Sequence, residues 1–319
     1  MKAARLVSPR EFEILDVPTP IIQPGEVLVR MEHLSVCGSD LRFYDRVLTE
    51  SDYPLDIGRP CHECLGTVAE SRDPSIEAGQ RVIALTYTGG LLEYAAVVAN
   101  RVVPVPDASD PALWVLCQPS GTVIYALQQI GSVLGKRVVV IGQGAIGLVF
   151  SDLLNRLGAV QVIATDLHDY RLDVAKRVGA THTINAAREN VVDAVREITG
   201  GAMADIAIEA VGRPEAAHQV FQVLRTSGLA VIFGMTHTED VFPFNWAEMY
   251  SKLPQMMVIN SQAAGTVVGA VRTCVDLVSQ GRLDFSYLVT HRLPFDKLSD
   301  AYELYSNKKD NSIKVLMSM

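Results

Sequence analysis

The sequence has no run of apolar residues long enough to cross a membrane as a helix, because glycines break up the longest apolar stretches. The segment from Met1 to Arg10 also lacks the apolar core of a signal peptide. Internal repeats and low-complexity segments are absent as well. These absences argue against a membrane protein or an exported protein, and we expect a cytoplasmic one.

Basic residues are too few for a nucleic-acid-binding protein. Lysine and arginine total 28 against 36 aspartates and glutamates, a formal net charge of −8, whereas binding to phosphate backbones requires a basic face. The remaining composition, 49% hydrophobic and 20% charged residues, is that of an ordinary globular protein, and a length of 319 residues favours two domains. The expected partner is therefore a small molecule, with no role for nucleic acid or membrane.

Cysteine is also scarce, with five residues in the chain and none between Gly66 and Asn100. An odd and low number argues against a framework of disulfides. It favours a reducing compartment, in which the cysteines are free thiols or metal ligands.

The most informative pattern present is a run of apolar residues followed by spaced glycines. Val138 to Ile141 carry no charge, as in a strand buried on both faces, and Gly142, Gly144 and Gly147 follow in the spacing G-x-G-x-x-G. Apolar residues then recur at helical intervals as far as Leu157. In such a strand–turn–helix unit the first glycine permits a tight turn, the second lets a pyrophosphate approach the backbone, and the third lets the helix pack on the strand. The N-terminus of the helix offers free N–H groups to the phosphates.

An acidic residue stands where a unit of this kind binds the ribose of a dinucleotide. The next strand-like segment, residues 160–166, ends in Asp166, roughly 20 residues after the glycines. A carboxylate at this place accepts hydrogen bonds from the ribose 2′-hydroxyl and repels a 2′-phosphate, so the pattern favours NAD over NADP. Asp166 could also cap the following helix, which is compatible with binding.

A change in the pattern of expected strands and helices divides the chain into two domains. In the first part, short strand-like segments such as 26–31 and 94–98 lie between Pro and Gly turns, which is typical of a barrel-like all-β domain. Farther along, strands alternate with helices, which predicts an α/β fold with six parallel strands in a doubly wound Rossmann sheet. The predicted domains are a β-barrel domain, residues 1–120 and 261–319, and a nucleotide-binding domain, residues 121–260.

Cysteine, histidine and acidic residues gather in two short segments of the first domain. One reads Val36-Cys37-Gly38-Ser39-Asp40, and the other reads Pro60-Cys61-His62-Glu63-Cys64. A thiolate and an imidazole are ligands that Zn²⁺ prefers, and a catalytic zinc needs three protein ligands and an open position. The spacing does not match a zinc finger. On spacing alone, the simpler interpretation is favoured: Cys37 is a small buried hydrophobic residue and His62 a hydrogen-bonded core histidine.

In combination, these motifs resemble those of the zinc-type medium-chain dehydrogenases. The matching features are Cys-Gly-Ser-Asp at 37–40, His-Glu-x-x-Gly at 62–66 and the Rossmann unit that begins near residue 121. The sequence is most similar to the polyol (sorbitol) and threonine dehydrogenase group, and the similarity extends to Val289-Thr-His-Arg-Leu-Pro-Phe. It implies a GroES-like catalytic domain with one catalytic Zn²⁺. It also implies hydride transfer from an alcohol held at zinc to C4 of the nicotinamide of NAD, in the cleft between the domains.

The resemblance also assigns roles to individual residues. Cys37 and His62 match the first two zinc ligands, and Ser39 matches the hydroxyl that binds the substrate alcohol and starts its proton relay. Asp40 matches a carboxylate that orients a metal ligand, and Glu63 matches an acid behind the zinc that can coordinate it transiently. The cofactor contacts implied besides the glycines and Asp166 are Thr122 and Ile146 beside the nicotinamide, Lys314 near the pyrophosphate, and Ala145 and Arg171.

The third zinc ligand departs from the family pattern. The family has a Cys or Glu shortly before the Rossmann domain, Glu-Pro in this group, whereas this chain reads Cys117-Gln118-Pro119. We expect Gln118 to replace the acid as a ligand. Its amide oxygen is neutral, so metal affinity should fall, while the centre keeps a net positive charge and becomes a stronger Lewis acid. In two alternatives, Glu63 enters the coordination shell, or Cys61 or Cys64 does.

Two further departures concern Arg42 and the missing cysteines. Arg42 replaces the relay histidine of the family, and an arginine stays charged near neutral pH and cannot cycle a proton. It either binds an anionic group of the substrate or cofactor, or it is an ordinary exposed arginine. The absence of cysteine between Gly66 and Asn100 removes the family's four-cysteine structural site, so we expect at most one zinc per subunit.

The function predicted from the sequence is a zinc- and NAD-dependent oxidoreductase that interconverts a secondary alcohol and a ketone. A polyol, sugar derivative or amino alcohol is the expected substrate. The alternatives are a zinc-independent NAD(P)H reductase of the same superfamily and a non-catalytic NAD-binding module, to which the changes at Gln118 and Arg42 point. Members of the family commonly pair their Rossmann domains through an edge strand, here near residues 256–260, which favours a homodimer or homotetramer.

Overall fold

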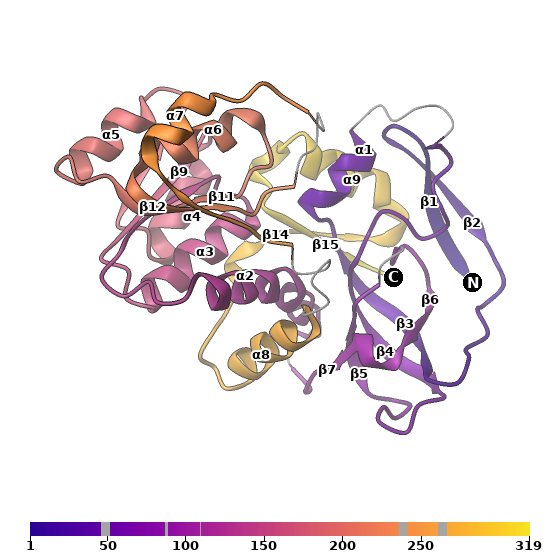
Figure 1. Cartoon of the computed structure of the whole chain (residues 1–319). Helices are drawn as coiled ribbons and strands as arrows, with labels where there is room; N and C mark the ends of the chain where they lie inside the picture. Colours follow the sequence, from indigo (N-terminus) through magenta and orange to yellow (C-terminus); the bar gives the residue numbers. More distant parts are fainter. Residues whose placement is uncertain (46–51, 87–88, 109, 236–240, 261–266) are drawn as a thin grey trace. The chain divides into compact units, whose positions relative to one another are not determined.

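The chain folds into two compact units. Unit 1 comprises Met1–Tyr125 and Gly265–Met319, and unit 2 comprises Ala126–Ala264. The first boundary falls inside helix α2 (Cys117–Ile130), a few residues beyond the position expected from the sequence. The structure is a computed structural model, and the residues it describes are 1–45, 52–86, 89–108, 110–235, 241–260 and 267–319 (Figure 1).

Unit 1 is built mainly from antiparallel strands. Its described strands are β1 (Lys2–Ser8), β2 (Glu11–Asp16), β3 (Glu26–Ser35), β4 (Glu63–Ser71), β5 (Arg81–Ala84), β6 (Tyr94–Val98), β7 (Val102–Pro104), β14 (Val289–Pro294) and β15 (Lys314–Ser318). Strands β1 and β2 form a hairpin, and the others form one sheet in the order β14-β15-β3-β4-β5-β7, with β6 also paired to β3.

Strand β3 organises unit 1, because it pairs with three other strands. It runs antiparallel to β4, β6 and β15. Strand β15 lies between β3 and β14, so the segment closest to the C-terminus, yellow in Figure 1, lies beside a strand near the N-terminus. The sheet thus brings residues from both ends of the chain to one place, where β3 ends and β4 begins.

Short helical segments connect the strands of unit 1. The described ones are η1 (Gly38–Asp40), α1 (Leu41–Tyr44), η3 (Ala99–Arg101), η4 (Pro111–Leu116), α8 (Val267–Ser279), η5 (Ser286–Leu288), η6 (Phe295–Lys297), α9 (Leu298–Ser306) and η7 (Lys309–Asn311). Helix α9 packs against β15, and Tyr302 on this helix contacts the rings of Phe12 and Tyr44 in the core of the unit.

Unit 2 is a doubly wound α/β unit. Its elements are β8 (Arg137–Ile141), α3 (Ala145–Arg156), β9 (Gln161–Asp166), α4 (Asp169–Val178), β10 (His182–Asn185), α5 (Val191–Ile198), β11 (Ala204–Glu209), α6 (Pro214–Val223), β12 (Leu224–Ile232), α7 (Trp246–Lys252) and β13 (Gln255–Val258). All pairings are parallel, in the order β10-β9-β8-β11-β12-β13. The six-stranded Rossmann sheet predicted from the sequence is confirmed.

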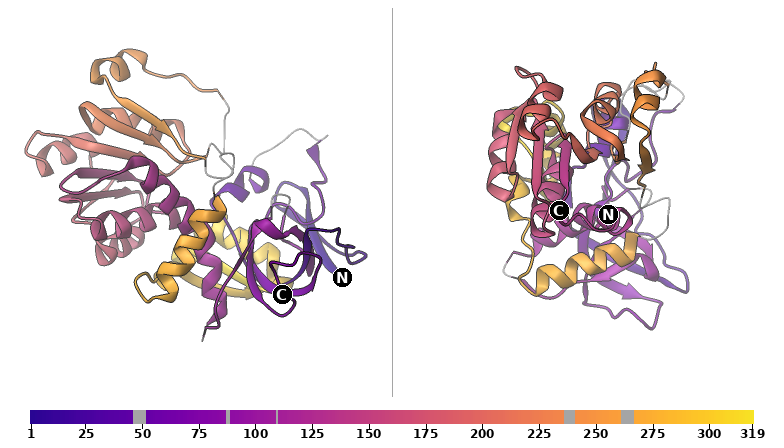
Figure 2. Two further views of the ribbon diagram at one scale, coloured as in Figure 1. Left: turned by 60° about the horizontal axis from the view of Figure 1, so that its bottom comes forward. Right: turned by 60° about the vertical axis from the view of Figure 1, so that its left-hand side comes forward.

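The sheet of unit 2 is covered by helices on both faces. Helices α3 and α4 pack on one face, and α5, α6 and α7 pack on the other; both layers can be followed in the two views of Figure 2. Val138 to Val140 are completely buried, as expected for a central parallel strand without charges. The chain order of the strands changes direction at β8, which lies between β9 and β11. Doubly wound sheets bind ligands at this point.

Some elements differ from those expected from the sequence. The β1–β2 hairpin and helix α7 have too few periodic residues for prediction by pattern, and β12 begins at Leu224, before the apolar run 229–232 from which a strand is expected. Leu224 has an extended backbone (φ −81°, ψ 140°), so α6 ends one residue before it. Among the described residues, no helix is long and apolar enough to span a bilayer.

Candidate functional site

A thiol, an imidazole and a carboxylate meet in unit 1. Cys37, His62 and Glu63 each bring one possible ligand atom within 4.8 Å of the others. Among the described histidines, cysteines and acids, no other group of three or more is arranged in this way. The structure thus brings together residues that lie 25 positions apart in the sequence, as the zinc hypothesis requires.

The sheet determines why these side chains meet. Cys37 follows the end of β3, His62 precedes β4, and the register of the two strands places Ser35 opposite Glu63. After Cys37 the chain turns at once into η1, whose backbone N–H of Asp40 donates to the carbonyl of Cys37 (3.1 Å). The segments that carry Cys37 and His62 are therefore held side by side by backbone pairing, without a contribution from a metal ion.

Asp40 holds the histidine and the cysteine from behind. Its Oδ1 lies 3.1 Å from Nδ1 of His62, and its Oδ2 accepts hydrogen bonds from the backbone N–H of Cys37 (3.0 Å) and the hydroxyl of Tyr302 (3.0 Å). Asp40 is 1% exposed, so these contacts act with little screening by water. The arrangement turns Nε2 of His62 toward the sulfur, and a carboxylate on Nδ1 is the usual outer partner of a metal-bound histidine.

Ser39 lies beside both ligand atoms. Its hydroxyl is 3.2 Å from Sγ of Cys37 and 3.4 Å from Nε2 of His62. Its donor and acceptor roles depend on the tautomer of the imidazole. A hydroxyl in this position can exchange a proton with a group bound at the cluster, which agrees with the role expected for Ser39.

The electrostatics of the cluster favour a cation. Burial lowers the pKa of His62, but the negative charges of Cys37 and Asp40 raise it by more, so the pKa is well above its ordinary value. A proton on the imidazole therefore fills the place that a metal ion would take, and metal binding would release it. The donor set, the buried carboxylate behind the histidine and the adjacent hydroxyl fit a Zn²⁺ ion.

Lys314 makes a buried contact with Glu63. Its ammonium is 2.6 Å and 2.5 Å from the two carboxylate oxygens of Glu63 and 3.0 Å from the carbonyl of Val36. Lys314 is 1% exposed and Glu63 is completely buried, and although burial lowers the pKa of Lys314, Glu63 and Cys37 raise it well above the ordinary lysine value. All three ammonium protons have acceptors inside unit 1, and these contacts give no support to the expected contact of Lys314 with a pyrophosphate, which stays a prediction.

The remaining metal-ligand candidates are Gln118, Cys61 and Cys64, and all three are buried. Gln118 is 3% exposed near the start of α2, just after η4, which packs on β3 and β4, and its role as third ligand stays a prediction. Cys61 donates toward the carbonyl of Ser35 (3.6 Å), and Cys64 lies 3.8 Å from the hydroxyl of Thr86. Neither cysteine belongs to the described cluster, so a rearranged site that uses one of them has no structural support. All five cysteines are free thiols.

Two further candidates have local contacts. The hydroxyl of Thr122 donates to the carbonyl of Pro119 (2.6 Å), one turn earlier in α2. The guanidinium of Arg42 lies 5.8 Å from the ring centre of its neighbour Phe43, and this side chain is half-buried. The predicted contacts of Thr122 with a nicotinamide and of Arg42 with an anion stay predictions.

The glycine turn of unit 2 has the geometry that a dinucleotide requires. Gly142 has φ +90°, a conformation that favours glycine, and a Cβ on Gly147 would lie 1.8 Å from the carbonyl oxygen of Gly142. A Cβ on Gly144 would meet no atom within 4 Å, so the space over this residue is open. Gly144 is the N-cap of α3, and the N–H groups of Ala145 and Ile146 begin the helix there.

Asp166 ends β9 next to this turn. It accepts hydrogen bonds from the backbone N–H of Gln143 (2.7 Å) and of His168 (3.0 Å), and it is 8% exposed. Arg171 lies 3.6 Å from the same carboxylate and also contacts Tyr170. The structure thus brings Gly142, Asp166 and Arg171 together, and the carboxylate keeps lone pairs for a further donor.

Sequence reasoning missed Glu209, which joins the loops at the same edge of the sheet. Its carboxylate accepts from the backbone N–H of Val211 (2.7 Å), Gly212 (2.8 Å) and Gly234 (3.1 Å), and it is 1% exposed. A Cβ on Gly142 would lie 2.5 Å from the side chain of Val211, so these loops also contact the glycine turn. The sequence did contain a signal for this role, because Glu209 ends an apolar run and Gly212 follows it.

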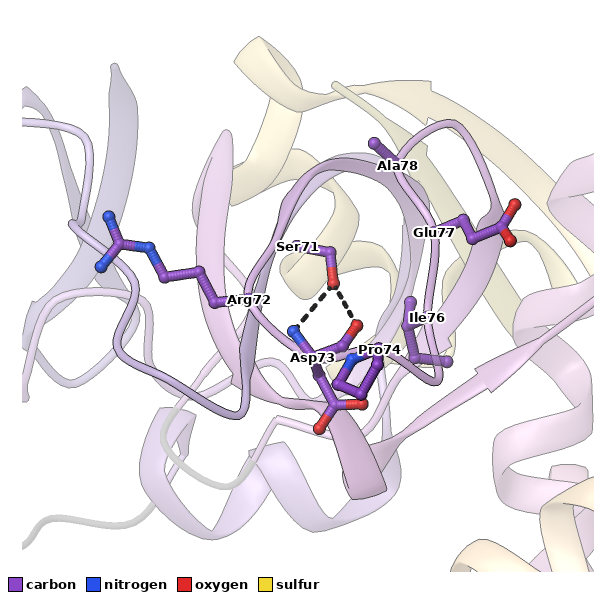
Figure 3. Close-up of a pocket in the computed structure, with 7 residues that line it drawn as sticks. All are labelled: Ser71, Arg72, Asp73, Pro74, Ile76, Glu77 and Ala78. Carbon is purple, nitrogen blue, oxygen red and sulfur yellow. Dashed lines mark hydrogen bonds between the residues drawn. The ribbon is translucent and has the colours of Figure 1, made fainter.

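A surface hollow in unit 1 has no comparable chemistry. It is lined by Ser71, Arg72, Asp73, Pro74, Ile76, Glu77 and Ala78 (Figure 3). The hydroxyl of Ser71 donates to the carbonyl of Asp73 and accepts from its N–H, and the Asp73 carboxylate accepts from Ser75. Ser71, Asp73 and Ser75 thus bond one another, and we assign no function to this loop.

A doubly wound sheet with a glycine turn, in one chain with a β-rich unit that holds a thiol and an imidazole, has the composition of a two-domain dehydrogenase. Residues 23–107 match the alcohol dehydrogenase GroES-like domain, and residues 145–279 match the zinc-binding dehydrogenase family. Together the two matches cover most of the chain. The chain belongs to the zinc-type medium-chain alcohol dehydrogenase family and is an oxidoreductase.

Individual relatives match the chain over nearly its whole length. An alcohol dehydrogenase from Cupriavidus necator is 26% identical, with 99% of this chain and 98% of the relative aligned. A sorbitol dehydrogenase from Bacillus subtilis (strain 168) is 25% identical over 99% of this chain and 97% of its own. The solved alcohol dehydrogenase TADH from Thermus sp. ATN1 is 25% identical with a TM-score of 0.88, and all of both chains is covered.

Proposed function

We propose that this protein oxidises a secondary alcohol to a ketone, or catalyses the reverse reaction, with Zn²⁺ and NAD as cofactors. The observation that carries the proposal is the cluster of Cys37 and His62 with Asp40 behind the imidazole and Ser39 beside both ligand atoms. A histidine that served the core alone would not require a thiol and a hydroxyl at the ring nitrogen that faces away from Asp40.

Cys37 and His62 would hold the zinc ion, with Gln118 as the proposed third ligand. When bound, Zn²⁺ acts as a Lewis acid that lowers the pKa of an alcohol hydroxyl, and NAD⁺ accepts the hydride. Asp40 keeps His62 in the tautomer that presents Nε2. Ser39 accepts the hydroxyl proton of the substrate at its Oγ and passes it on, since this oxygen is adjacent to both proposed ligands.

The dinucleotide is bound by the residues around the glycine turn. The N–H groups at the start of α3 receive the pyrophosphate over Gly144, and Asp166 accepts a ribose hydroxyl. The carboxylate favours NAD, and its contact with Arg171 reduces but does not cancel its charge. The relative named sorbitol dehydrogenase supports a polyol or a related polar alcohol as substrate.

Metal analysis combined with turnover tests the proposal. Purified protein should contain about one zinc per chain, reduce NAD⁺ in the presence of at least one compound from a panel of polyols and amino alcohols, and lose this activity on treatment with a chelator. Cys37→Ser should lose both the metal and the activity. Turnover by zinc-free protein would refute the zinc mechanism, and zinc-loaded protein that does not bind NAD would refute the assignment of NAD.

Replacement of Asp166 tests the choice of dinucleotide. Asp166→Ala should erode the preference for NAD over NADP, because the charge that repels a 2′-phosphate is removed. The ratio of kcat/KM for the two cofactors is the measurement. Arg171→Ala is the matched control, since removal of the cation should leave the preference for NAD intact or increase it. A ratio that Asp166→Ala leaves unchanged would reject the role of Asp166.

A further inference from the structure

Lys314 and Glu63 form an ion pair that is buried beside the proposed metal ligands. The two side chains are 1% and 0% exposed, and both oxygens of Glu63 lie within 2.6 Å of the ammonium. The third acceptor of Lys314 is the carbonyl of Val36, which immediately precedes Cys37. A pair of opposite charges in which all three ammonium protons have acceptors is the kind that a protein interior tolerates.

Glu63 is nevertheless close enough to be a ligand. One of its oxygens lies within 4.8 Å of both the sulfur of Cys37 and a ring nitrogen of His62. A free carboxylate at this distance from a divalent cation would bind it and add a second negative charge to the ligand set. What distinguishes Glu63 from Cys37 and His62 is that its oxygens already face a cation.

The position of Lys314 is fixed by the sheet and not by Glu63. Lys314 is the first residue of β15, whose residues 316–318 pair with 33–35 of β3, and the N–H of Val36 donates to the carbonyl of Val315 (3.1 Å). The strand therefore holds the ammonium at the junction of β3 and β4 whether or not a metal is present. Because β4 is paired with β3 as well, both residues are anchored at this junction, and the ammonium determines the direction in which the Glu63 carboxylate points.

We propose that Lys314 is a positioning residue that retains Glu63 outside the coordination shell, so that Cys37 is the one anionic ligand of the metal. This inference rests on the metal site proposed above. The sequence left two possibilities open, with either Gln118 or Glu63 in the coordination shell. The inference excludes Glu63, so the remaining coordination position belongs to Gln118 or to solvent. Glu63 then acts only through its charge, from behind the site. The centre then keeps the net positive charge that makes it a stronger Lewis acid.

Cobalt spectroscopy of the full-length protein tests the proposal. Co²⁺ replaces Zn²⁺ after removal of the native metal by a chelator, and its visible absorption reports the number and kind of ligands independently of turnover. Wild type and Glu63→Gln should give the same spectrum, because Glu63 is not a ligand, although Glu63→Gln should bind Co²⁺ more weakly because the buried ammonium of Lys314 is left without its counter-charge. Lys314→Met should change the spectrum and tighten Co²⁺ binding by about tenfold, because the released carboxylate joins the ligands.

Two control variants make the result specific. Lys314→Arg keeps the cation and should retain the wild-type spectrum, and the double variant Lys314→Met/Glu63→Gln should regain it because no carboxylate is left to bind. A spectrum that changes in Glu63→Gln alone would show that Glu63 is already a ligand, and the proposal would be wrong. An unchanged spectrum in folded Lys314→Met would also overturn it.

The experiment stays decisive if Lys314→Met does not fold or if wild-type protein does not bind Co²⁺. If Lys314→Met does not fold, the comparison of wild type, Glu63→Gln and Lys314→Arg still decides whether Glu63 coordinates. Failure of wild-type protein to bind Co²⁺ would refute the proposed metal site itself, whereas failure of the spectral pattern in Co²⁺-loaded protein refutes the role of Lys314 alone.

Discussion

At the scale of single residues, the contacts of Asp40 predict how the metal site depends on its surroundings. Asp40→Asn should weaken Zn²⁺ binding by about 10- to 100-fold, as loss of the outer partner of a ligating histidine commonly does. Tyr302→Phe should have a smaller effect, because the Cys37 N–H still donates to the same carboxylate oxygen. Competition with a chromophoric chelator measures both affinities. Equal affinities in Asp40→Asn and wild type would contradict the role of Asp40.

Two glycines of the dinucleotide turn should respond to alanine in opposite ways. Gly144→Ala places a methyl group in open space, so the thermal unfolding midpoint should stay unchanged while NAD binding weakens by about tenfold or more. Gly147→Ala forces a methyl group against the carbonyl of Gly142, so the unfolding midpoint should fall. Unfolding scans and NAD titrations separate the two. If Gly144→Ala bound NAD normally, the phosphate would not approach this residue.

The chemical roles of single residues were more predictable from the sequence than their partners in space. Gly142 and Asp166 lie in motifs that are local in the sequence, so their types and spacing already indicate their chemistry. For Cys37 and His62 the spacing alone favoured core residues, and the resemblance to a family indicated the metal site. The partner of Glu63 is 251 positions away, and nothing in the sequence around Lys314 refers to it. Sheet pairing supplies that information, because β15 reaches the end of β3 only in the folded chain.

At the scale of elements, Asp205 joins three strands of unit 2 and makes their stability depend on pH. Its carboxylate accepts from the Arg137 side chain (3.0 and 3.1 Å) and from Arg225 (2.7 Å), which links β11 to β8 and β12. The hydrogen bonds from Arg137 hold the pKa of Asp205 well below its ordinary value, although burial partly opposes them. A carboxyl with a lowered folded-state pKa stabilises the fold fully above its unfolded pKa, and this stabilisation is lost as the pH falls toward the folded value.

Asp205→Asn should therefore lower the free energy of unfolding at pH 7 by about 2 kcal/mol. The difference from wild type should shrink below about pH 4, where the carboxyl of the unfolded chain takes up its proton. Urea denaturation at pH 7 and pH 3 gives both values. Asp193→Asn is the control, since Asp193 is 68% exposed in its ion pair with Arg196 and should contribute little. A pH-independent difference would show that charge is not the cause.

The elements of unit 2 were more predictable than those of unit 1. Buried parallel strands such as β8 are continuous apolar runs in the sequence, and these runs indicate strands directly. The strands of unit 1 alternate in short lengths, and their order in the sheet depends on contacts between distant segments. For this reason the sequence indicated an all-β domain but gave no register, and the junction of β3 and β4 could not be derived from it.

At the scale of the whole molecule, strand β13 predicts association of two copies. It is the edge strand of its sheet, and Met256 and Val258 on it are 60% and 70% exposed, as are Trp246 (68%) and Tyr250 (67%) on α7. An apolar edge strand with free backbone groups pairs readily with another strand, and a twofold axis lets two identical edges pair with each other. We expect a homodimer formed through β13, or a tetramer built from such dimers.

Met256→Lys should disrupt this association, because a charge on an edge strand opposes pairing. Light scattering should give at least twice the chain mass of 34.7 kDa for wild type and a mass nearer to one chain for the variant. Val160→Lys is the matched control, since Val160 is equally exposed at 60% but does not lie on β13. A monomeric wild type would refute the interface, and an unchanged mass of Met256→Lys would place it elsewhere.

The position of β15 beside β3 also fixes an order of events during synthesis of the protein. Cys37, His62 and Glu63 leave the ribosome before Tyr302 and Lys314, which bind the two acids behind the cluster and lie 262 positions after Asp40 and 251 positions after Glu63. A metal ion captured by the nascent chain would meet Glu63 without its lysine and would bind the carboxylate. The folded protein can reach its own ligand set only when β15 has paired with β3, so maturation of the metal centre has to follow synthesis of β15.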